Sequence, residues 1–322
     1  MFLRKYRLET PPKSACIFAL LGSAAFALAE PASDESVKPV SSALSVDEIA
    51  LELSSPAPRL GGIAVDMEYT TFQGSLPEAD DQTAFRSVIT GSWPIRLSSG
   101  NDLLLRATLP ILGDQPYWQP ANRRDYADFV IRQVPSIDPT TGQFITGHDH
   151  LGDISVDVGY GGVNENGLTH MFGIVITAPT SEDRSARRAQ WLVGPEIALG
   201  RTTRWGLYGV RAQHLTDISG EGKQEVDLDT NETTLRLSFA YALGNGWQIE
   251  SNPVISYDWE AVSDNKWTVP VGAGVSKTVL LGSVPMKMAV ELHNYVVSPD
   301  RFGPEWLLRF AVTPVFSSKL LR

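Results

Sequence analysis

Apolar and polar side chains alternate along most of the chain from Ile63 to Phe316. Residues 63–70 place apolar side chains on one face and the acids Asp66 and Glu68 on the other. Such period-two alternation is typical of a β-strand with one apolar face. No part of this region has the period of a long amphipathic helix, so the sequence predicts a nearly all-β protein.

Twelve segments show this alternation. Most are about nine to fourteen residues long, which exceeds the ~5–6 residues usual in soluble sheets and suits the ~9–11 that cross a bilayer when tilted. The predicted strands cover residues 62–72, 82–95, 101–112, 153–161, 169–179, 189–199, 205–216, 230–243, 247–259, 267–279, 285–297 and 305–316.

The connections between these strands alternate in length. Every odd-numbered connection is longer than its neighbours, and the longest, residues 113–152, is predicted to be one long external loop. In outer-membrane barrels short turns, such as Asn245–Gly246 here, face the periplasm and long loops face outside. The pattern predicts a transmembrane antiparallel β-barrel of about twelve strands over residues 61–316, closed because lipid tolerates no unpaired strand edge.

Aromatic side chains gather near the predicted strand ends, where an apolar ring with a polar handle suits the boundary between lipid and water. Aromatic residues of an ordinary protein core would cluster in a similar way. This pattern therefore supports a membrane barrel only in combination with strand length and the alternation of loop lengths. The residues are Trp93, Trp191, Trp205, Trp247, Tyr257, Trp259, Trp267, Tyr295 and Trp306.

Residues 1–29 have the form of a cleaved secretory signal peptide. Arg4, Lys5 and Arg7 precede an apolar run that ends at Ala29 and is shorter than the roughly 20 residues of a spanning helix. The only cysteine, Cys16, would leave with this segment, so the exported chain would have no disulfide. We therefore predict insertion in the outer membrane, with its lipid and the barrel-assembly machinery as partners.

Residues 30–60 are rich in Ser, Pro and Ala and are predicted to be a periplasmic lead-in segment. One short helix is expected at Ser45–Leu53, where Ser45 and Glu48 have the spacing of a capping box. The segment would contact a periplasmic partner or plug the lower mouth of the barrel, and the sequence does not choose. Residues 317–322 form a C-terminal tail.

Composition excludes several classes of protein. With 20% charged and 43% hydrophobic residues and a mean hydropathy of −0.09, the chain is neither disordered nor a bundle of membrane helices. The signal peptide holds four basic residues and one acid, so its removal would change the net charge from −10 to −13. Such an acidic chain is not expected to bind nucleic acid.

Several short motifs in residues 85–316, most of them after residue 200, carry a resemblance to a known family. They are Gly152 and Asp153; Gly173, Pro179 and Thr180; Trp191, Gly194 and Pro195; Asn245, Gly246 and Trp247; Tyr257, Asp258 and Trp259; Lys266, Trp267, Val269 and Pro270; Gly303, Pro304, Glu305 and Trp306; and Arg309, Phe310, Val312 and Thr313.

These motifs resemble the bacterial outer-membrane β-barrel family named for the meta-pathway of phenol degradation, whose members are regarded as transporters. The resemblance implies a membrane barrel and suggests aromatic or other hydrophobic compounds as the transported class. The chain departs from outer-membrane barrels in one respect, since it continues past Phe316 instead of ending on an aromatic residue. Phe316 would then serve as an internal equivalent of that terminal signal.

Charged residues of both signs occupy the faces opposite the apolar ones. If the apolar faces meet lipid, these residues line the lumen, either as rings of charge that select solutes or as ion pairs that fill the barrel. The predicted lumenal residues are Asp66, Glu68, Arg86, Arg106, Asp157, Glu196, Arg211, Arg236, Glu250, Glu291, His293 and Arg309.

The long external loop contains further candidates. Tyr117 and Trp118 are expected to form a first-contact surface for solutes. His148, Asp149 and His150 make only a weak metal pair, because two histidines and one acid fall short of a usual ligand set. We predict no metal and no cofactor, since the chain also lacks a P-loop and a dinucleotide fingerprint.

The sequence thus predicts an outer-membrane barrel, not an enzyme, that mediates passage of small molecules. Two alternatives stay open. A barrel-embedded hydrolase would need His214 or His293 beside a serine such as Ser256 or Ser276, without any nucleophile-elbow pattern to support it. A soluble periplasmic β-barrel that binds an apolar ligand would show the same alternation, with the apolar faces inside and the polar faces outside.

Overall fold

The strands of the structure follow the predicted alternation. The computed structural model describes residues 44–120, 142–147, 150–164, 166–181, 190–218, 230–261 and 265–316. Twelve antiparallel strands form the barrel wall, one of them divided into two short pieces. They are β1 (Gly61–Gln73), β2 (Thr83–Arg96), β3 (Asp102–Leu112), β7 (Ile154–Val163), β8 (Leu168–Ala178), β9 (Leu192–Thr202), β10 (Gly206–Asp217), β11 (Asn231–Gly244), β12 (Trp247–Ser251) with β13 (Val254–Asp258), β14 (Trp267–Leu281), β15 (Val284–Val297) and β16 (Gly303–Phe316).

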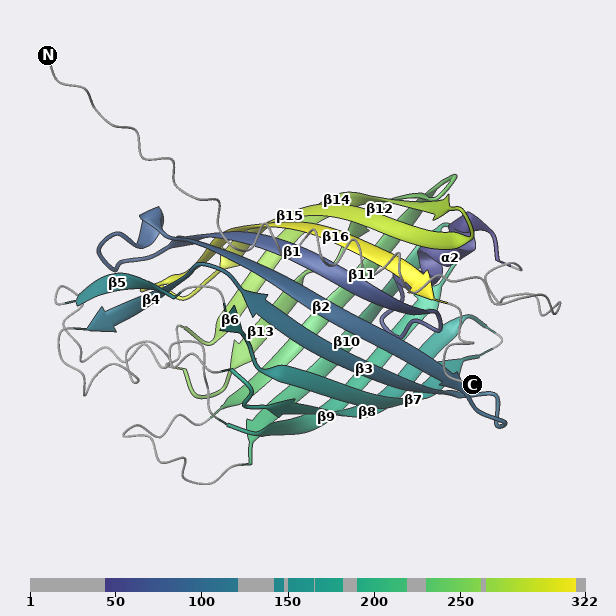
Figure 1. Ribbon diagram of the computed structural model, residues 1–322, viewed down its shortest axis with the longest axis horizontal. Helices are drawn as coiled ribbons and strands as arrows, with labels where there is room; N and C mark the ends of the chain where they lie inside the picture. The colour runs from purple at the N-terminus through teal and green to yellow at the C-terminus, as the bar shows by residue number, and fades with distance from the viewer. Residues whose placement is uncertain are drawn as a thin grey trace, which may run out of the picture. The chain divides into compact units, whose positions relative to one another are not determined.

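The ladder of these strands closes on itself (Figure 1). β1 pairs with both β2 and β16, and β10 pairs with both β9 and β11, so the sheet has no free lateral edge. A spanning β-structure needs this closure because lipid offers no hydrogen-bond partner to an open edge. The predicted fold, a closed antiparallel barrel of about twelve strands, is confirmed.

The outer surface of the barrel is apolar. Phe172, Ile174 and Val271 are 60%, 55% and 59% exposed, whereas Glu68 on the inner face is 4% exposed. A soluble barrel around an apolar ligand would have the opposite arrangement, so this alternative is excluded. Exposed tryptophans lie near both ends of the wall, as the sequence predicted; they are Trp191, Trp205, Trp247, Trp259, Trp267 and Trp306.

The two ends of the barrel differ. Short turns join the strands at one end, at residues 97–101, 164–167, 203–205, 245–246 and 282–283. The strand ends that the longer connections join lie at the other end, together with the short helix η2 (Ala79–Asp81). The predicted long external loop is not free of regular structure, because it contains the hairpin β4 (Gln115–Pro120) with β5 (Gly142–Gly147), and β6 (His150–Leu151) paired to β3.

The short helix of the lead-in segment is also confirmed, as α2 (Val46–Leu53). The Ser45 hydroxyl accepts from the Glu48 N–H at 3.2 Å, and the Glu48 carboxylate accepts from the Ser45 N–H at 2.7 Å. This capping box satisfies two backbone donors that the first turn leaves open. The predicted signal peptide 1–29 and tail 317–322 lie outside the described residues. No helix in the described part is both long and apolar enough to span a membrane.

Candidate functional site

The lumen contains a cavity of about 460 Å³ lined by side chains from around the barrel wall. Acids and bases occur there in near-equal numbers. Of the predicted lumenal residues, Asp66, Glu68, Arg86, Arg106, Asp157, Arg211, Arg236, Glu250, Glu291 and Arg309 line this cavity. Glu196 and His293 are buried at its margin, at 2% and 1% exposure.

Four of these side chains form a wall cluster, defined as Arg106, Asp157, Glu196 and Arg211. Arg106 lies directly opposite Asp157 in the ladder of β3 and β7 and donates to it at 3.0 Å. Arg211 on β10 reaches Glu196 at 3.2 Å and Asp157 at 3.6 Å. All four partners belong to strands of the wall, so this cluster ties fixed elements to one another.

A second group, the β16 cluster, consists of Glu68, Arg86, Glu291 and Arg309. Arg309 lies opposite Glu68 on one side and Glu291 on the other, and its guanidinium contacts them at 2.9 and 3.6 Å. Arg86 also donates to Glu68. His293 adds a contact of 3.2 Å to Glu291. The register of the ladder therefore sets opposite charges side by side.

Asp66 and Arg236 differ from these clusters. Both line the cavity, yet neither forms an ion pair or a side-chain hydrogen bond with another described residue. Arg236 is exposed and lies opposite Arg211 in the ladder of β10 and β11, so like charges are neighbours there. Asp66 and Arg236 are thus the lumenal charges most available to a solute.

Residues 44–60, here called the plug segment, lie at the short-turn end of the barrel. Helix α2 contacts β11, β12, β14 and β15. Asp47 accepts from the N–H of Gly246 in the turn between β11 and β12. Ile49 packs with Leu60 and with Val315 of β16, so apolar burial fixes the helix to the wall.

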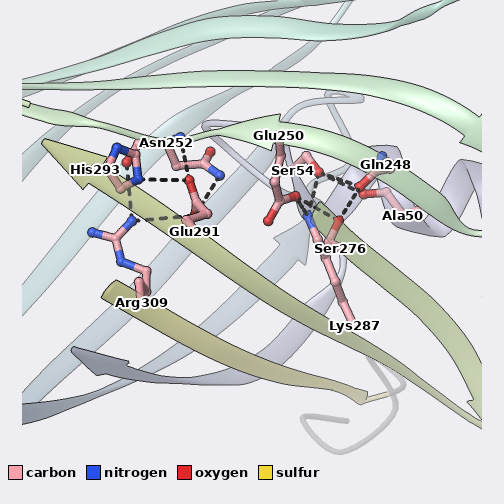
Figure 2. A network of polar contacts seen from close by, with 10 residues as sticks. All are labelled: Ala50, Ser54, Gln248, Glu250, Asn252, Ser276, Lys287, Glu291, His293 and Arg309. Carbon is pink, nitrogen blue, oxygen red and sulfur yellow. Dashed lines mark hydrogen bonds and ion pairs between the residues drawn. The ribbon is translucent and has the colours of Figure 1, made fainter. Parts of the chain in front are cut away.

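A buried polar network then links the plug segment to three wall strands (Figure 2). The plug cluster comprises Ser54, Gln248, Glu250, Ser276 and Lys287. Lys287 donates to the Ser54 hydroxyl at 2.7 Å and contacts Glu250 at 2.6 Å. Ser54 in turn donates to Gln248 at 3.1 Å. Lys287 and Glu250 are only 8% and 2% exposed, so each charge depends on the other inside the barrel.

Beyond Ser54 the chain enters the lumen. Pro56 lies against Gly200 of β9, where an added Cβ would come within 2.9 Å of the Pro56 ring. Ala57 packs with Leu104, Met171 and Ala198 of the wall. Glycine and alanine on the inner wall thus leave the space that the plug segment occupies. Residues 53–56 and Pro58 thus line the lumenal cavity, a position that suits the plug among the two roles that the sequence left open for the lead-in segment.

The predicted lumenal set omitted Lys287, Gln248, Ser276 and Ser54. Lys287 lies two strand positions before Ala289 and four before Glu291, on the same inner face, so the alternation already placed it there. Ser54 had no such signal, because its partner Lys287 is 233 residues away. Contacts between a lead-in segment and a wall strand follow no local period.

The other candidate sites do not assemble in the described residues. His214 lies beside Thr233 at 2.9 Å, and His293 beside Glu291, so neither histidine hydrogen-bonds Ser256 or Ser276 as the embedded hydrolase required. His148 and Asp149 lie outside the described residues, within which no group of three or more potential metal ligands occurs.

Trp118 does not belong to the contact surface expected of the external loop. Its side chain is 2% exposed and packs with Leu76, Ala79, Phe144 and Phe302. A large apolar ring at the base of a hairpin gains more from this packing than from exposure to water. Tyr117, the other expected contact residue, is partly buried.

No family model and no curated protein sequence matches the chain. Several solved structures of outer-membrane proteins align with it. The COG4313 outer membrane channel from Pseudomonas putida F1 aligns with a TM-score of 0.56 at 11% identity, over 82% of this chain and 98% of that one. The NanC porin gives 0.42 at 11% identity over 77% and 98%, and the CymD monoaromatic hydrocarbon channel 0.38 at 9% identity over 89% and 94%.

At such low identity the similarity concerns the fold. The fold and the lumen together define a twelve-strand β-barrel of the outer-membrane type, with a charged interior and a plug segment at the short-turn end. The outer-membrane part of the sequence resemblance is thereby supported.

Proposed function

We propose that the protein is an outer-membrane channel for small molecules whose plug segment closes the periplasmic mouth. The observation that carries this proposal is the continuous charged cavity of about 460 Å³ that ends at the plug segment. A cavity of about 150 Å³ can hold a benzene molecule, so the lumen has room for a single-ring solute with its polar groups hydrated. Short turns beside the plug segment favour the periplasmic side for this end.

The lumenal charges support passage of solutes that carry a polar group. Arg236 and Asp66 are available to orient such a group, while the ion pairs of the wall and β16 clusters hold the inner surface in shape. Charged rings of this kind select by sign and by hydrogen bonding. The sequence resemblance adds aromatic compounds as the solute class.

The plug segment is suited to move because, apart from the peptide bond that joins Leu60 to β1, only noncovalent contacts hold it to the wall. Its polar attachments are the plug cluster and the bond from the Gly246 N–H to Asp47. Its apolar attachments are the contact of Ile49 and Leu60 with Val315 and the packing of Ala57 against three wall residues. Displacement would expose Lys287 and Glu250 to water together, so the two charges would remain paired or become solvated.

The test compares single-channel conductance of the refolded chain with that of a variant lacking residues 44–59, both in planar bilayers. Heat-modifiable gel mobility first establishes that each barrel is folded. We expect small steps from the parent and steps several-fold larger from the deletion, because the deletion removes the closure and leaves the wall intact. Equal steps would show that residues 44–59 do not close the lumen. Absence of steps from both folded barrels would contradict the channel itself.

A further inference from the structure

Among the described wall strands, the longest gap in the ladder lies between β14 and the divided strand of β12 and β13. The ladder between β12 and β14 runs from Trp247 to Glu250, and pairing with β14 resumes only at Ser256 and Tyr257 of β13. The register is the same on both sides of the gap. Ser251–Ile255 and Val269–Ala273 therefore face each other without ladder pairs, and we call these two stretches the seam.

Prolines explain part of the interruption. Pro270 lies opposite Val254 in the shared register and has no N–H to donate, and Pro253 stands at the junction of β12 and β13. Proline is normally confined to edge strands or bulges for this reason. The seam lies between the exposed tryptophans Trp267 and Trp247, so it is at membrane depth. Unpaired backbone at that depth is tolerated only where it is buried in protein or lines a water-filled cavity.

The seam meets that condition, because its backbone turns into the lumen. The Asn252 N–H donates to the Glu291 carboxylate at 2.8 Å, and the Asn252 side chain donates to it at 3.2 Å (Figure 2). Arg309 donates to the Asn252 carbonyl at 3.3 Å. Asn252, Glu291 and Arg309 all line the lumenal cavity. The inner side of the seam is thus continuous with the proposed solute path.

Small side chains border one end of the seam. On the inner face Gly272 and Gly274 leave room for His293 and Glu291, and an added Cβ at Gly272 would lie 2.7 Å from His293 Nδ1. That buried nitrogen has no hydrogen-bond partner. On the outer face Ser251 and Ala273 are small, and the rest of the seam carries Pro253, Ile255, Val269 and Val271.

One side-chain hydrogen bond crosses the seam. The Ser251 hydroxyl donates to the Gly272 carbonyl at 2.7 Å, in place of a backbone ladder bond. A serine side chain can rotate away from this carbonyl without unpairing a strand. The two stretches are therefore held together less firmly than any neighbouring part of the same wall.

We propose that the seam is a lateral portal through which small apolar molecules pass between the lumen and the bilayer. The outer side favours apolar solutes, since Val271 and Val275 face hydrocarbon at 59% and 50% exposure. Five unpaired residues per strand span roughly 16 Å, longer than a one- or two-ring molecule. The portal rests on the proposed function, because solutes must reach it through the lumen.

The test locks the seam and leaves the lumen unchanged. Ser251→Cys with Ala273→Cys forms a disulfide across the seam, where the register sets the two residues opposite each other. Ile249→Cys with Val275→Cys is the matched control, a paired site on the same outer faces two residues away. Cys16→Ser is present in every variant, so only the introduced pair can oxidise.

Two measurements are made on each full-length variant. Entry of N-phenyl-1-naphthylamine, an uncharged aromatic dye that fluoresces in lipid, is followed in Gram-negative cells with intact lipopolysaccharide. Potassium chloride conductance is recorded in planar bilayers. We expect the oxidised seam pair to lower dye entry to the level of cells without the protein, and dithiothreitol to restore it. The oxidised control pair should retain parent entry, and conductance should be equal in all.

The portal proposal would be overturned if the seam disulfide left dye entry unchanged, or if dye entry fell equally in the control pair. A parent that conducts potassium chloride but admits no dye would also overturn it while leaving the channel standing. Dye entry that depends on the seam in a barrel without conductance would support the portal and contradict the polar channel.

A second variant tests the portal if the cysteine pairs fail to fold. Ser251→Ala removes the hydrogen bond across the seam and should raise dye entry by about fivefold, which corresponds to the about 1 kcal/mol of one neutral hydrogen bond. Conductance should be unchanged, because Ser251 faces away from the lumen. Unchanged dye entry from a folded Ser251→Ala barrel would contradict the portal.

Discussion

The wall cluster and the plug cluster are both buried groups of charged side chains, but they connect different parts of the protein. In the wall cluster Arg106 and Arg211 join acids on neighbouring strands, so every partner is part of the barrel. In the plug cluster Lys287 also bonds Ser54, which belongs to a segment outside the sheet. The same interaction thus stabilises a fixed wall in one region and retains a separable segment in the other.

This difference determines whether the loss of a charged side chain should lower the stability of the barrel or raise the open fraction of the channel. A buried carboxylate that loses its partner costs about 3–5 kcal/mol when water cannot reach it. The strands around Asp157 cannot move apart without opening the barrel. Around Glu250, departure of the plug segment would admit water, so the same loss should promote opening instead of unfolding.

The largest expected effect comes from paired substitutions in the two clusters. Arg106→Leu leaves Arg211 as the one basic side chain that pairs with Asp157 and Glu196. It should lower the free energy of unfolding by about 3 kcal/mol, the lower end for a broken buried pair. Urea unfolding of the barrel in lipid measures this loss. Channel opening by Arg106→Leu should stay close to that of the parent.

Lys287→Leu is the matched variant in the plug cluster. It should change unfolding much less than Arg106→Leu and should raise the open fraction in planar bilayers, because the plug segment loses its bond to Ser54. If both variants destabilise the barrel equally and neither changes the open fraction, the distinction between the two clusters is wrong.

Much of the wall was predictable from the sequence because its period is local. The predicted strands 62–72 and 285–297 correspond to β1 at Gly61–Gln73 and β15 at Val284–Val297. A lipid-facing strand repeats its apolar residues at every second position, and a slip by one residue would reverse its faces. The same alternation placed the predicted charged residues inside.

The parts that the sequence did not predict depend on distant contacts. The predicted strand 247–259 is divided at Asn252–Pro253, and Pro253 was a local signal for a break that the alternation obscured. The inward turn of Asn252 depends on Glu291 and Arg309, which lie on other strands. The burial of Trp118 depends on Phe302, far along the chain.

A smaller effect should follow from crowding the plug segment without touching a charge. In Gly200→Ala the new methyl group would lie 2.9 Å from the Pro56 ring and 3.4 Å from the Tyr208 carbonyl, so the plug segment meets it more closely than the wall does. Overpacking of this kind costs about 1–3 kcal/mol. We expect a higher open fraction in planar bilayers with unchanged urea unfolding.

The control for Gly200→Ala is the double variant with Pro56→Ala, which removes the ring atoms that clash. It should return the open fraction toward that of the parent. A double variant that opens as often as Gly200→Ala would show that the methyl group acts on the wall, and would weaken the view that the plug segment moves as a separate body.

The smallest effect concerns the cap of α2. The Ser45 N–H and hydroxyl hold the pKa of Glu48 below its ordinary value of 4.5, because both hydrogen-bond the ionised carboxylate. A lowered pKa means that this carboxylate stabilises the helix above pH 4.5 and that the contribution is lost as the pH falls below that value. The open fraction of the parent should therefore rise slightly on acidification.

Glu48→Gln should lack this part of the pH dependence, whereas Glu52→Gln, which removes the same charge from α2 and leaves the cap intact, should keep it. Equal pH profiles for parent and Glu48→Gln would mean that the cap does not help to hold the plug segment in place.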